Sequence, residues 1–343
     1  MVVVLHTLGQ GGILRNTVPY SSHYYVAWFL EIGSYCAVNC FALISGYVMY
    51  RSRPSVSRIL QLWFQVIFYT ILITGIFTVI YPDKFSLKSL IKAFFPISFN
   101  QYWYISAYFG LYLLIPVLNA AIAHIEKKAY DILLLSMFAL YCFFGYFSLH
   151  DAYSLSSGYS MIWLCILYLL GAYLHKYNIA ATIKKRRSFG LYILMVILTF
   201  LPKILLRNFK NGSYIDILVS YVSPTIVFSS ISLFLVFANA SEIRPLQKLI
   251  RLLAPASLGV YLIHVHPIVW SLVPNIYKSF VENNLVVMTL LIFAAAVGVY
   301  LMCSIIELVR IKLFAWFRIK KLCDWIERTV AAKFDCAYEK AGQ

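Results

Sequence analysis

The feature that most constrains this chain is a series of apolar runs, each close to the length that crosses a membrane. A spanning helix needs about 20 predominantly apolar residues, because hydrocarbon offers no water to unpaired backbone groups. Such runs occupy residues 25–50, 58–81, 101–124, 129–149, 158–176, 188–206, 214–238, 257–280 and 285–310. An apolar stub at 1–9 precedes them. We therefore predict an all-α transmembrane bundle of about ten helices, with the first one truncated.

The composition agrees with a membrane protein. Only 12% of the 343 residues are charged, whereas soluble domains contain about 25%. No alternating ten-residue pattern predicts a β-barrel. Because the loops between the runs are short, we expect one membrane domain over residues 1–314 and a basic amphipathic cytoplasmic tail over 315–343.

The net charge of +16 bears on membrane topology through the distribution of Lys and Arg along the chain. In a soluble protein it would favour nucleic acid as the partner, but in a membrane protein cytoplasmic loops carry the excess of Lys and Arg. Most of the 29 Lys and Arg fall on one side if the N-terminus is cytoplasmic and the loops alternate. We expect a multi-pass protein of the plasma membrane, with both termini cytoplasmic, the lipid bilayer as a partner and no nucleic acid.

The tail segment 314–330 mixes aromatic and aliphatic side chains with Lys and Arg. This pattern is typical of a helix that lies on a membrane surface, and a helix that binds a protein partner is the alternative. The seven cysteines lie mostly inside apolar runs, where they act as small hydrophobic residues. We therefore expect no metal site.

His6 is the first candidate functional residue, because it interrupts the apolar stub. An ionisable side chain inside a membrane helix indicates function by default. Imidazole titrates near neutral pH and can accept a proton from a hydroxyl, so His6 is a candidate general base. The alternative is a histidine that is hydrogen-bonded to a neighbouring helix. We expect an upstream segment to complete this half-length helix.

The run at 25–50 contributes Glu31 and Asn39 as candidate substrate-binding residues. They would lie about 12 Å apart along an ideal helix, and the small residues nearby equally favour close helix packing. Arg51, Arg53 and Arg58 follow this run. They are ordinary topology signals, but guanidinium groups also bind phosphate bidentately, so they are candidate ligands of a phosphorylated cofactor.

Two later runs add further candidates. Trp103 lies among aromatic residues at a helix start, where an interfacial belt is the alternative to substrate binding. Tyr261 and His264 are three residues apart and share a helix face, whereas His266 is predicted to point roughly the opposite way. Because two histidines in one membrane run are costly, we favour a catalytic role for Tyr261 and His264.

Three charged residues have simpler explanations. Glu307 and Arg310 are three residues apart near the cytoplasmic end of the last run, so we expect them to pair with each other. Asp216 lies near the outer end of its run and is expected to be solvated.

Taken in order, several short motifs resemble those of the acyltransferase-3 family of integral membrane acyltransferases. Order and approximate spacing match over about residues 1–314, and the nearest likeness is to the bacterial branch that acetylates cell-surface glycans and lipid-linked sugars. The motifs are Val-Val-Leu-His6, Asn39-Cys-Phe-Ala-Leu-Ile-Ser45-Gly46-Tyr47, the basic stretch through Arg58 into Leu62-Trp63, the segment from Tyr102-Trp103-Tyr104 to Pro116, and Gly259-Val-Tyr261-Leu-Ile-His264.

The resemblance implies acetyl-CoA as the acyl donor, entering from the cytoplasm, and a hydroxyl of a glycan or lipid-linked sugar as the acceptor. His6 matches the histidine that is taken as catalytic in the family and would be the general base. Trp103, Tyr261 or His264 would donate to the oxyanion, and Arg58 is the foremost candidate for the CoA phosphates. The family also has an arginine upstream of the histidine, at a position that this sequence does not include.

Two other classes of protein stay open at this stage. The same membrane module occurs as the transport half of membrane-bound serine racemases, so a small-molecule transporter, for example an amino acid carrier, is the alternative function. Intramembrane His, Glu and Asn suit a transporter, but no pair of broken helices in matching halves indicates alternating access. A purely structural membrane protein would leave the histidines unexplained. The sequence gives no oligomeric state.

Overall fold

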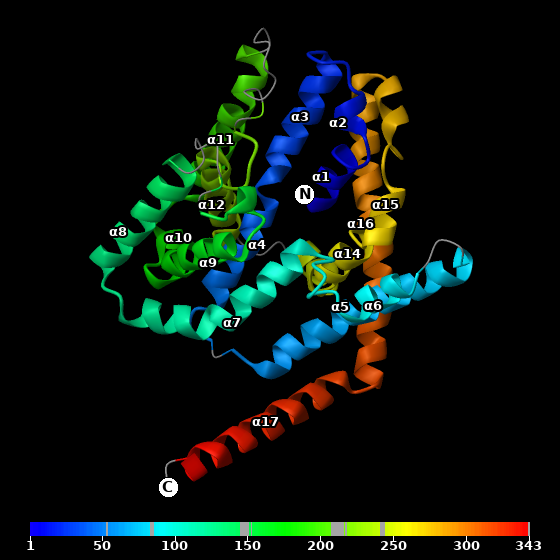
Figure 1. Cartoon of the computed structure of the whole chain (residues 1–343). Helices are drawn as coiled ribbons and strands as arrows, with labels where there is room; N and C mark the ends of the chain where they lie inside the picture. The colour runs from blue at the N-terminus through cyan, green and yellow to red at the C-terminus, as the bar shows by residue number, and fades with distance from the viewer. Residues whose placement is uncertain are drawn as a thin grey trace. The chain divides into compact units, whose positions relative to one another are not determined.

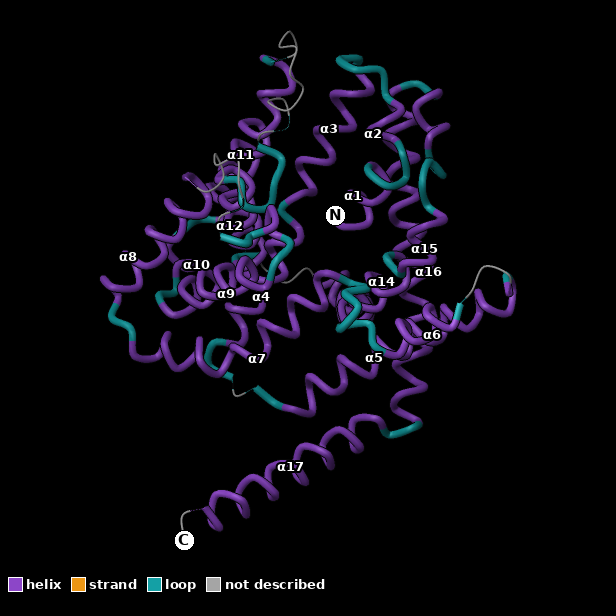
Figure 2. Tube along the Cα trace, viewed as in Figure 1, coloured by secondary structure: helices purple, strands orange, loops and turns teal. Residues whose placement is uncertain are grey.

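The computed structural model describes residues 1–52, 54–82, 86–144, 151, 153–206, 216, 218–240 and 244–341, with side chains up to 332. Within these residues the chain consists of helices joined by loops and turns, and no strand occurs among them (Figure 2). The predicted all-α fold class is therefore confirmed.

Six helical segments of the described chain are long and apolar enough to cross a membrane. Two shorter apolar helices, Met161–Lys176 and Pro224–Ala238, accompany them. The protein is thus a multi-pass membrane protein by its helices, while the predicted number of about ten is not confirmed. The six segments are Ser22–Met49, Val56–Ile80, Trp103–His124, Lys185–Leu205, Arg244–His264 and Leu285–Trp316.

The chain folds into two compact units, and each contains segments that are distant in sequence. Unit 1 comprises Met1–Ser52, Leu113–Ile243 and Leu272–Gly298. Unit 2 comprises Arg53–Tyr112, Arg244–Ser271 and Val299–Gln343. Two long helices, α7 (Trp103–His124) and α16 (Leu285–Trp316), contribute residues to both units.

Unit 1 is built from helices near the N-terminus and in the middle of the chain, and Leu272–Gly298 joins them from its last third (Figure 1). Its most extensive packing is between α4 and α9 and between α11 and α12, while α3 packs against both α1 and α11. The helices are α1 (Val2–Leu8), α2 (Ile13–Asn16), α3 (Ser22–Tyr35), α4 (Ala37–Met49), α8 (Lys127–Met137) with its π-helical continuation Phe138–Phe144, α9 (Met161–Lys176), α10 (Ile179–Thr182), α11 (Lys185–Leu205) and α12 (Pro224–Ala238).

Glycine sets the contact between α4 and α9. A Cβ on Gly46 would collide with the Tyr168 carbonyl of α9, and a Cβ on Gly171 would collide with the Leu43 carbonyl of α4. Small residues let two helix backbones approach closely, and this close approach takes the place of the hydrophobic effect inside a bilayer. The small residues that the sequence predicted to be packing positions therefore include Gly46.

Asn119 shows why a polar residue occupies the apolar helix α7. Its Nδ2 donates to the Met49 and Ser52 carbonyls at 3.1 and 3.2 Å, and its Oδ1 accepts from the Tyr168 hydroxyl at 2.7 Å. The last carbonyls of a helix have no partner within the helix. Asn119 therefore caps the end of α4 and joins it to α7 and α9.

Unit 2 is organised around α5. Its buried core includes Val66, Tyr69 and Ile73 of α5 with Tyr102, Ile105 and Leu262, and the Tyr102 hydroxyl donates to the Leu262 carbonyl at 2.9 Å. The helices of this unit are α5 (Val56–Ile80), α6 (Leu87–Phe94), α13 (Arg244–Leu253), α14 (Ser257–His264), α15 (Pro267–Leu272) and α17 (Ile319–Ala341).

Three predicted segments differ from the structure. The run at 25–50 forms two helices that meet at Cys36. The run at 257–280 is interrupted after His264, because Pro267 lacks the amide that would continue the helix and disfavours helical backbone in the residue before it. The last membrane helix extends to Trp316, and a separate tail helix begins at Ile319.

Candidate functional site

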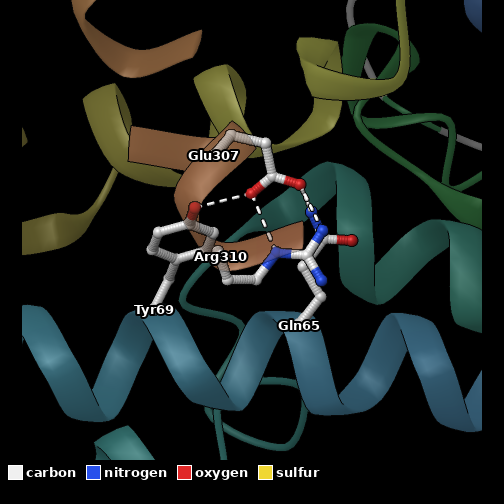
Figure 3. A network of polar contacts seen from close by, with 4 residues as sticks. All are labelled: Gln65, Tyr69, Glu307 and Arg310. Carbon is white, nitrogen blue, oxygen red and sulfur yellow. Dashed lines mark hydrogen bonds and ion pairs between the residues drawn. The ribbon is translucent and has the colours of Figure 1, made fainter. Parts of the chain in front are cut away.

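A carboxylate with four hydrogen bonds lies in unit 2, that of Glu307, a fully buried residue of α16. Gln65 Nε2 donates to Oε1 at 3.0 Å, and the Tyr69 hydroxyl donates to Oε2 at 2.5 Å. Arg310 Nε donates to Oε2 at 3.0 Å and its Nη2 donates to Oε1. Figure 3 shows the three side chains converging on Glu307. The predicted Glu307–Arg310 pair is thus confirmed, and it also fastens α5 to α16.

Gly259 of α14 completes this network from the third side. A Cβ at this position would collide with the Glu307 carboxylate, so the backbone of α14 lies directly against it. The four hydrogen bonds to Glu307 come from Gln65 and Tyr69 of α5 and from Arg310 of α16. The network joins α5 to α16 and lies against α14. We therefore assign this network to the architecture of unit 2.

Tyr261 and His264 lie together, as their spacing predicts, with ring centroids 6.3 Å apart. His266 lies in the same aromatic cluster, since the Tyr102 ring is 6.1 Å from Tyr261 and 6.3 Å from His266. The helix ends at His264, so His266 lies beyond it and its direction stays a prediction. Both histidines are buried.

The two histidines have opposite hydrogen-bonding patterns. His264 Nδ1 is 2.5 Å from the Val260 carbonyl and must donate to it, so in a neutral ring Nε2 is the nitrogen with the lone pair. His266 Nδ1 accepts from the Ile268 amide at 3.3 Å, so its proton is on Nε2. In unit 2, His264 is therefore suited to accept a proton and His266 to donate a hydrogen bond. Trp103 begins α7 in the same unit, with its ring edge-on to Tyr104.

His6 belongs to unit 1, whereas Tyr261 and His264 belong to unit 2. It lies near the end of α1 and is half-buried among the buried residues Leu5 and Thr7. The chain turns directly after this helix, where the Gly11 amide donates to the His6 carbonyl at 2.8 Å. Helix α1 packs against α3, so unit 1 brings the His6 helix to the helix that bears Glu31.

Glu31 and Asn39 have different surroundings in unit 1. Asn39 is fully buried, with Nδ2 donating to the Tyr221 carbonyl at 2.8 Å and Oδ1 accepting from Trp163 Nε1 at 3.1 Å. Both polar atoms of its amide are therefore used within the protein, which favours a structural role. Glu31 is 8% exposed, and its Oε2 has no hydrogen-bond partner among the described residues.

The arginines belong to different units, Arg51 to unit 1 and Arg53 and Arg58 to unit 2. Arg51 is exposed and lies 5.3 Å from the Tyr50 ring centroid in unit 1, Arg53 lies outside the described residues, and Arg58 is exposed in the first turn of α5. At this helix start, Glu327 of α17 accepts from the Val56 amide at 2.7 Å and from the Ser55 hydroxyl at 3.1 Å. Glu327 of the tail thus caps α5.

Sequence reasoning missed several members of these clusters. Gln65 and Tyr69 are four residues apart and lie on one face of α5. Two polar residues at this spacing in an apolar helix could have indicated a polar contact with another helix. The sequence indicated no role for Lys203, yet it is fully buried and pairs with Asp216, whose side chain is 55% exposed. Among the described residues, no group of three or more His, Cys, Asp or Glu side chains is placed to hold a metal ion.

A comparison with protein-family models finds one that covers most of the chain. The model describes an acyltransferase domain, Acyl_transf_3, and it matches residues 1–306. The match includes the whole of α1 with His6 as well as the segment that bears Tyr261 and His264. No curated protein and no solved structure gives a significant match.

Proposed function

The chain belongs to the acyltransferase-3 family, and from this premise we propose that it is a membrane O-acetyltransferase. The acetyl group would move from cytoplasmic acetyl-CoA to a hydroxyl of a cell-surface or lipid-linked glycan. The observation that supports this proposal most is the family match over residues 1–306, which takes in nearly all of the membrane helices.

In the proposed reaction His6 is the general base. A sugar hydroxyl is a weak nucleophile at neutral pH, so its proton must be removed as its oxygen attacks the thioester carbonyl. The imidazole would accept that proton. When the tetrahedral intermediate collapses, the bond from carbon to sulfur breaks and CoA leaves as a thiolate, which takes the proton back. The products are an acetyl ester and CoA with a free thiol.

Other residues would serve binding and charge stabilisation. The oxyanion of the intermediate needs hydrogen-bond donors, and Trp103, Tyr261 and His264 stay our predictions for that role. His264 would donate only as the imidazolium, through Nε2, because its Nδ1 proton already bonds to the Val260 carbonyl. Arg58, with Arg51 and Arg53, stays our prediction for the CoA phosphates, because guanidinium matches phosphate in geometry and charge. The exposed position of Arg58 is compatible with such contact.

The test uses the purified full chain in liposomes with acetyl-CoA labelled in the acetyl group. The proposal expects label to appear on a glycan or lipid-linked sugar acceptor as a base-labile ester, in amounts that rise with the amount of protein. Protein-dependent uptake of an unmodified solute, with no label on any acceptor, would contradict the proposal and favour the transporter instead.

A further inference from the structure

Helix α13 (Arg244–Leu253) of unit 2 presents an apolar side that the described part of the chain leaves uncovered. None of its ten residues is buried. The aliphatic side chains that are between 45% and 55% exposed are Leu246, Leu249, Ile250 and Leu252. A contiguous apolar surface of this kind marks a place that meets a membrane or a protein partner.

Basic and aliphatic residues occupy opposite sides of this helix. Arg244, Lys248 and Arg251 recur at intervals of four and three residues and are all exposed, so they form one side. The other side follows the i, i+3, i+4, i+7 spacing of an apolar face and consists of Leu246, Leu249, Ile250 and Leu253. This division is typical of a helix that lies in the plane of a membrane surface.

The positions of the cations favour a helix that lies along the membrane over one that crosses it. The segment Arg244–His264 is long enough to cross a bilayer, but the 3₁₀ turn Ala254–Ala256 divides it into α13 and α14. Arg251 follows Arg244 by seven residues, about 10 Å along a helix, so a crossing α13 would carry a guanidinium group into hydrocarbon, which is costly. An in-plane α13 keeps all three cations at the level of the lipid headgroups.

The charge of α13 favours an anionic partner. The ion pairs of the described chain involve other residues, so none of these three cations has a carboxylate partner there. Anionic phospholipid supplies the counter-charge, because each Lys or Arg near an anionic membrane surface is attracted to it and guanidinium binds phosphate bidentately. A second copy of α13 on the same face would bring six cations together, and like charges repel.

We propose that α13 is an in-plane helix that binds anionic phospholipid. Its aliphatic side enters the bilayer, and Arg244, Lys248 and Arg251 contact the lipid phosphates. The inference goes beyond the proposed function, because it concerns lipid recognition and holds whatever reaction the protein performs.

The test uses the full chain in nanodiscs of phosphatidylcholine, with or without phosphatidylglycerol, which differs in the net charge of its headgroup. Hydrogen–deuterium exchange followed by mass spectrometry measures the α13 amides separately from those of the tail helix α17 and needs no activity. The α13 amides should exchange at least about tenfold more slowly with phosphatidylglycerol present, because three cations then hold the helix on the surface. Added salt should reduce the difference, because it screens exposed charges.

Two variants of α13 separate its basic side from its aliphatic side. Replacing the three cations together, by Arg244→Gln, Lys248→Gln and Arg251→Gln, keeps the aliphatic side and should make exchange equal in the two lipids. Leu249→Gln keeps the cations and should speed exchange of α13 in both lipids, because it weakens insertion of the aliphatic side.

The matched control also replaces one Lys and two Arg, at the exposed start of α11 in unit 1, by Lys185→Gln, Arg186→Gln and Arg187→Gln. It should leave the lipid dependence of α13 unchanged. Equal exchange of α13 in the two lipids for the unaltered protein, or a lipid dependence that persists without the three α13 cations, would overturn the inference. Protection of α13 that requires two chains in one nanodisc would identify a second copy as the partner and would also overturn it.

Discussion

The Glu307 network predicts a graded loss of stability in unit 2. Tyr69→Phe removes one of the four hydrogen bonds to the carboxylate and leaves the other three from Gln65 and Arg310. A hydrogen bond to a charged group is worth about 1.5–3 kcal/mol in soluble proteins, whereas those between membrane helices average about 0.6 kcal/mol. We expect Tyr69→Phe to lower the free energy of unfolding by about 1 kcal/mol.

Glu307→Ala should cost considerably more. It removes all four hydrogen bonds and leaves the Arg310 side chain, which is 11% exposed, without its counter-charge. Breaking a buried pair by removing one partner costs about 3–5 kcal/mol. The assay is equilibrium unfolding of the purified protein in mixed micelles, followed by the loss of helical circular dichroism.

The matched control is the ion pair between Lys127 and Asp131, whose side chains are 58% and 36% exposed. Exposed pairs at this helical spacing contribute about 0.3–0.5 kcal/mol, so Lys127→Ala should have little effect on stability. The reasoning would be refuted if Glu307→Ala cost no more than Lys127→Ala, or if Tyr69→Phe were as stable as the unaltered protein.

Two further predictions concern helix contacts. Gly46→Ala should destabilise unit 1 by about 1–3 kcal/mol, because the added methyl collides with the Tyr168 carbonyl. The control Gly75→Ala adds a methyl where no atom lies within 4 Å and should not lower stability. Equal unfolding curves for the two variants would contradict the packing described for α4 and α9. Glu327→Ala should speed hydrogen exchange of the Val56 amide, because it removes the acceptor 2.7 Å away; unchanged exchange at Val56, measured by mass spectrometry, would show that the tail does not cap α5.

The sequence predicted the elements of this fold well where one physical rule dominates. Long apolar runs correspond to helices because an unpaired backbone is too costly in hydrocarbon. The pairing of Glu307 with Arg310 followed from a spacing of three residues on one helix. Such inferences need only local geometry.

Contacts between distant segments could not be predicted in the same way. Tyr69 reaches Glu307 across 238 positions of the chain, and Lys203 reaches Trp28 from another helix, so neither contact leaves a periodic signal. The interruption beyond His264 was misjudged although Pro267 was visible, because the length of the apolar run outweighed the effect of one proline. The roles of Asn39 and Asn119 became apparent only with their hydrogen-bond partners.

The most direct test of the central claim compares two histidine variants in the acetyl-transfer assay. His6→Ala removes the proposed base, whereas His124→Ala removes an exposed imidazole whose Nδ1 lies 2.9 Å from the Ala120 carbonyl of its own helix. Loss of a general base typically slows catalysis by about 10²–10⁴-fold. The kcat of His6→Ala, inserted normally in the membrane, should therefore fall by at least about 10²-fold, while His124→Ala keeps full activity. Acetyl transfer by His6→Ala at the rate of the unaltered protein would contradict the account.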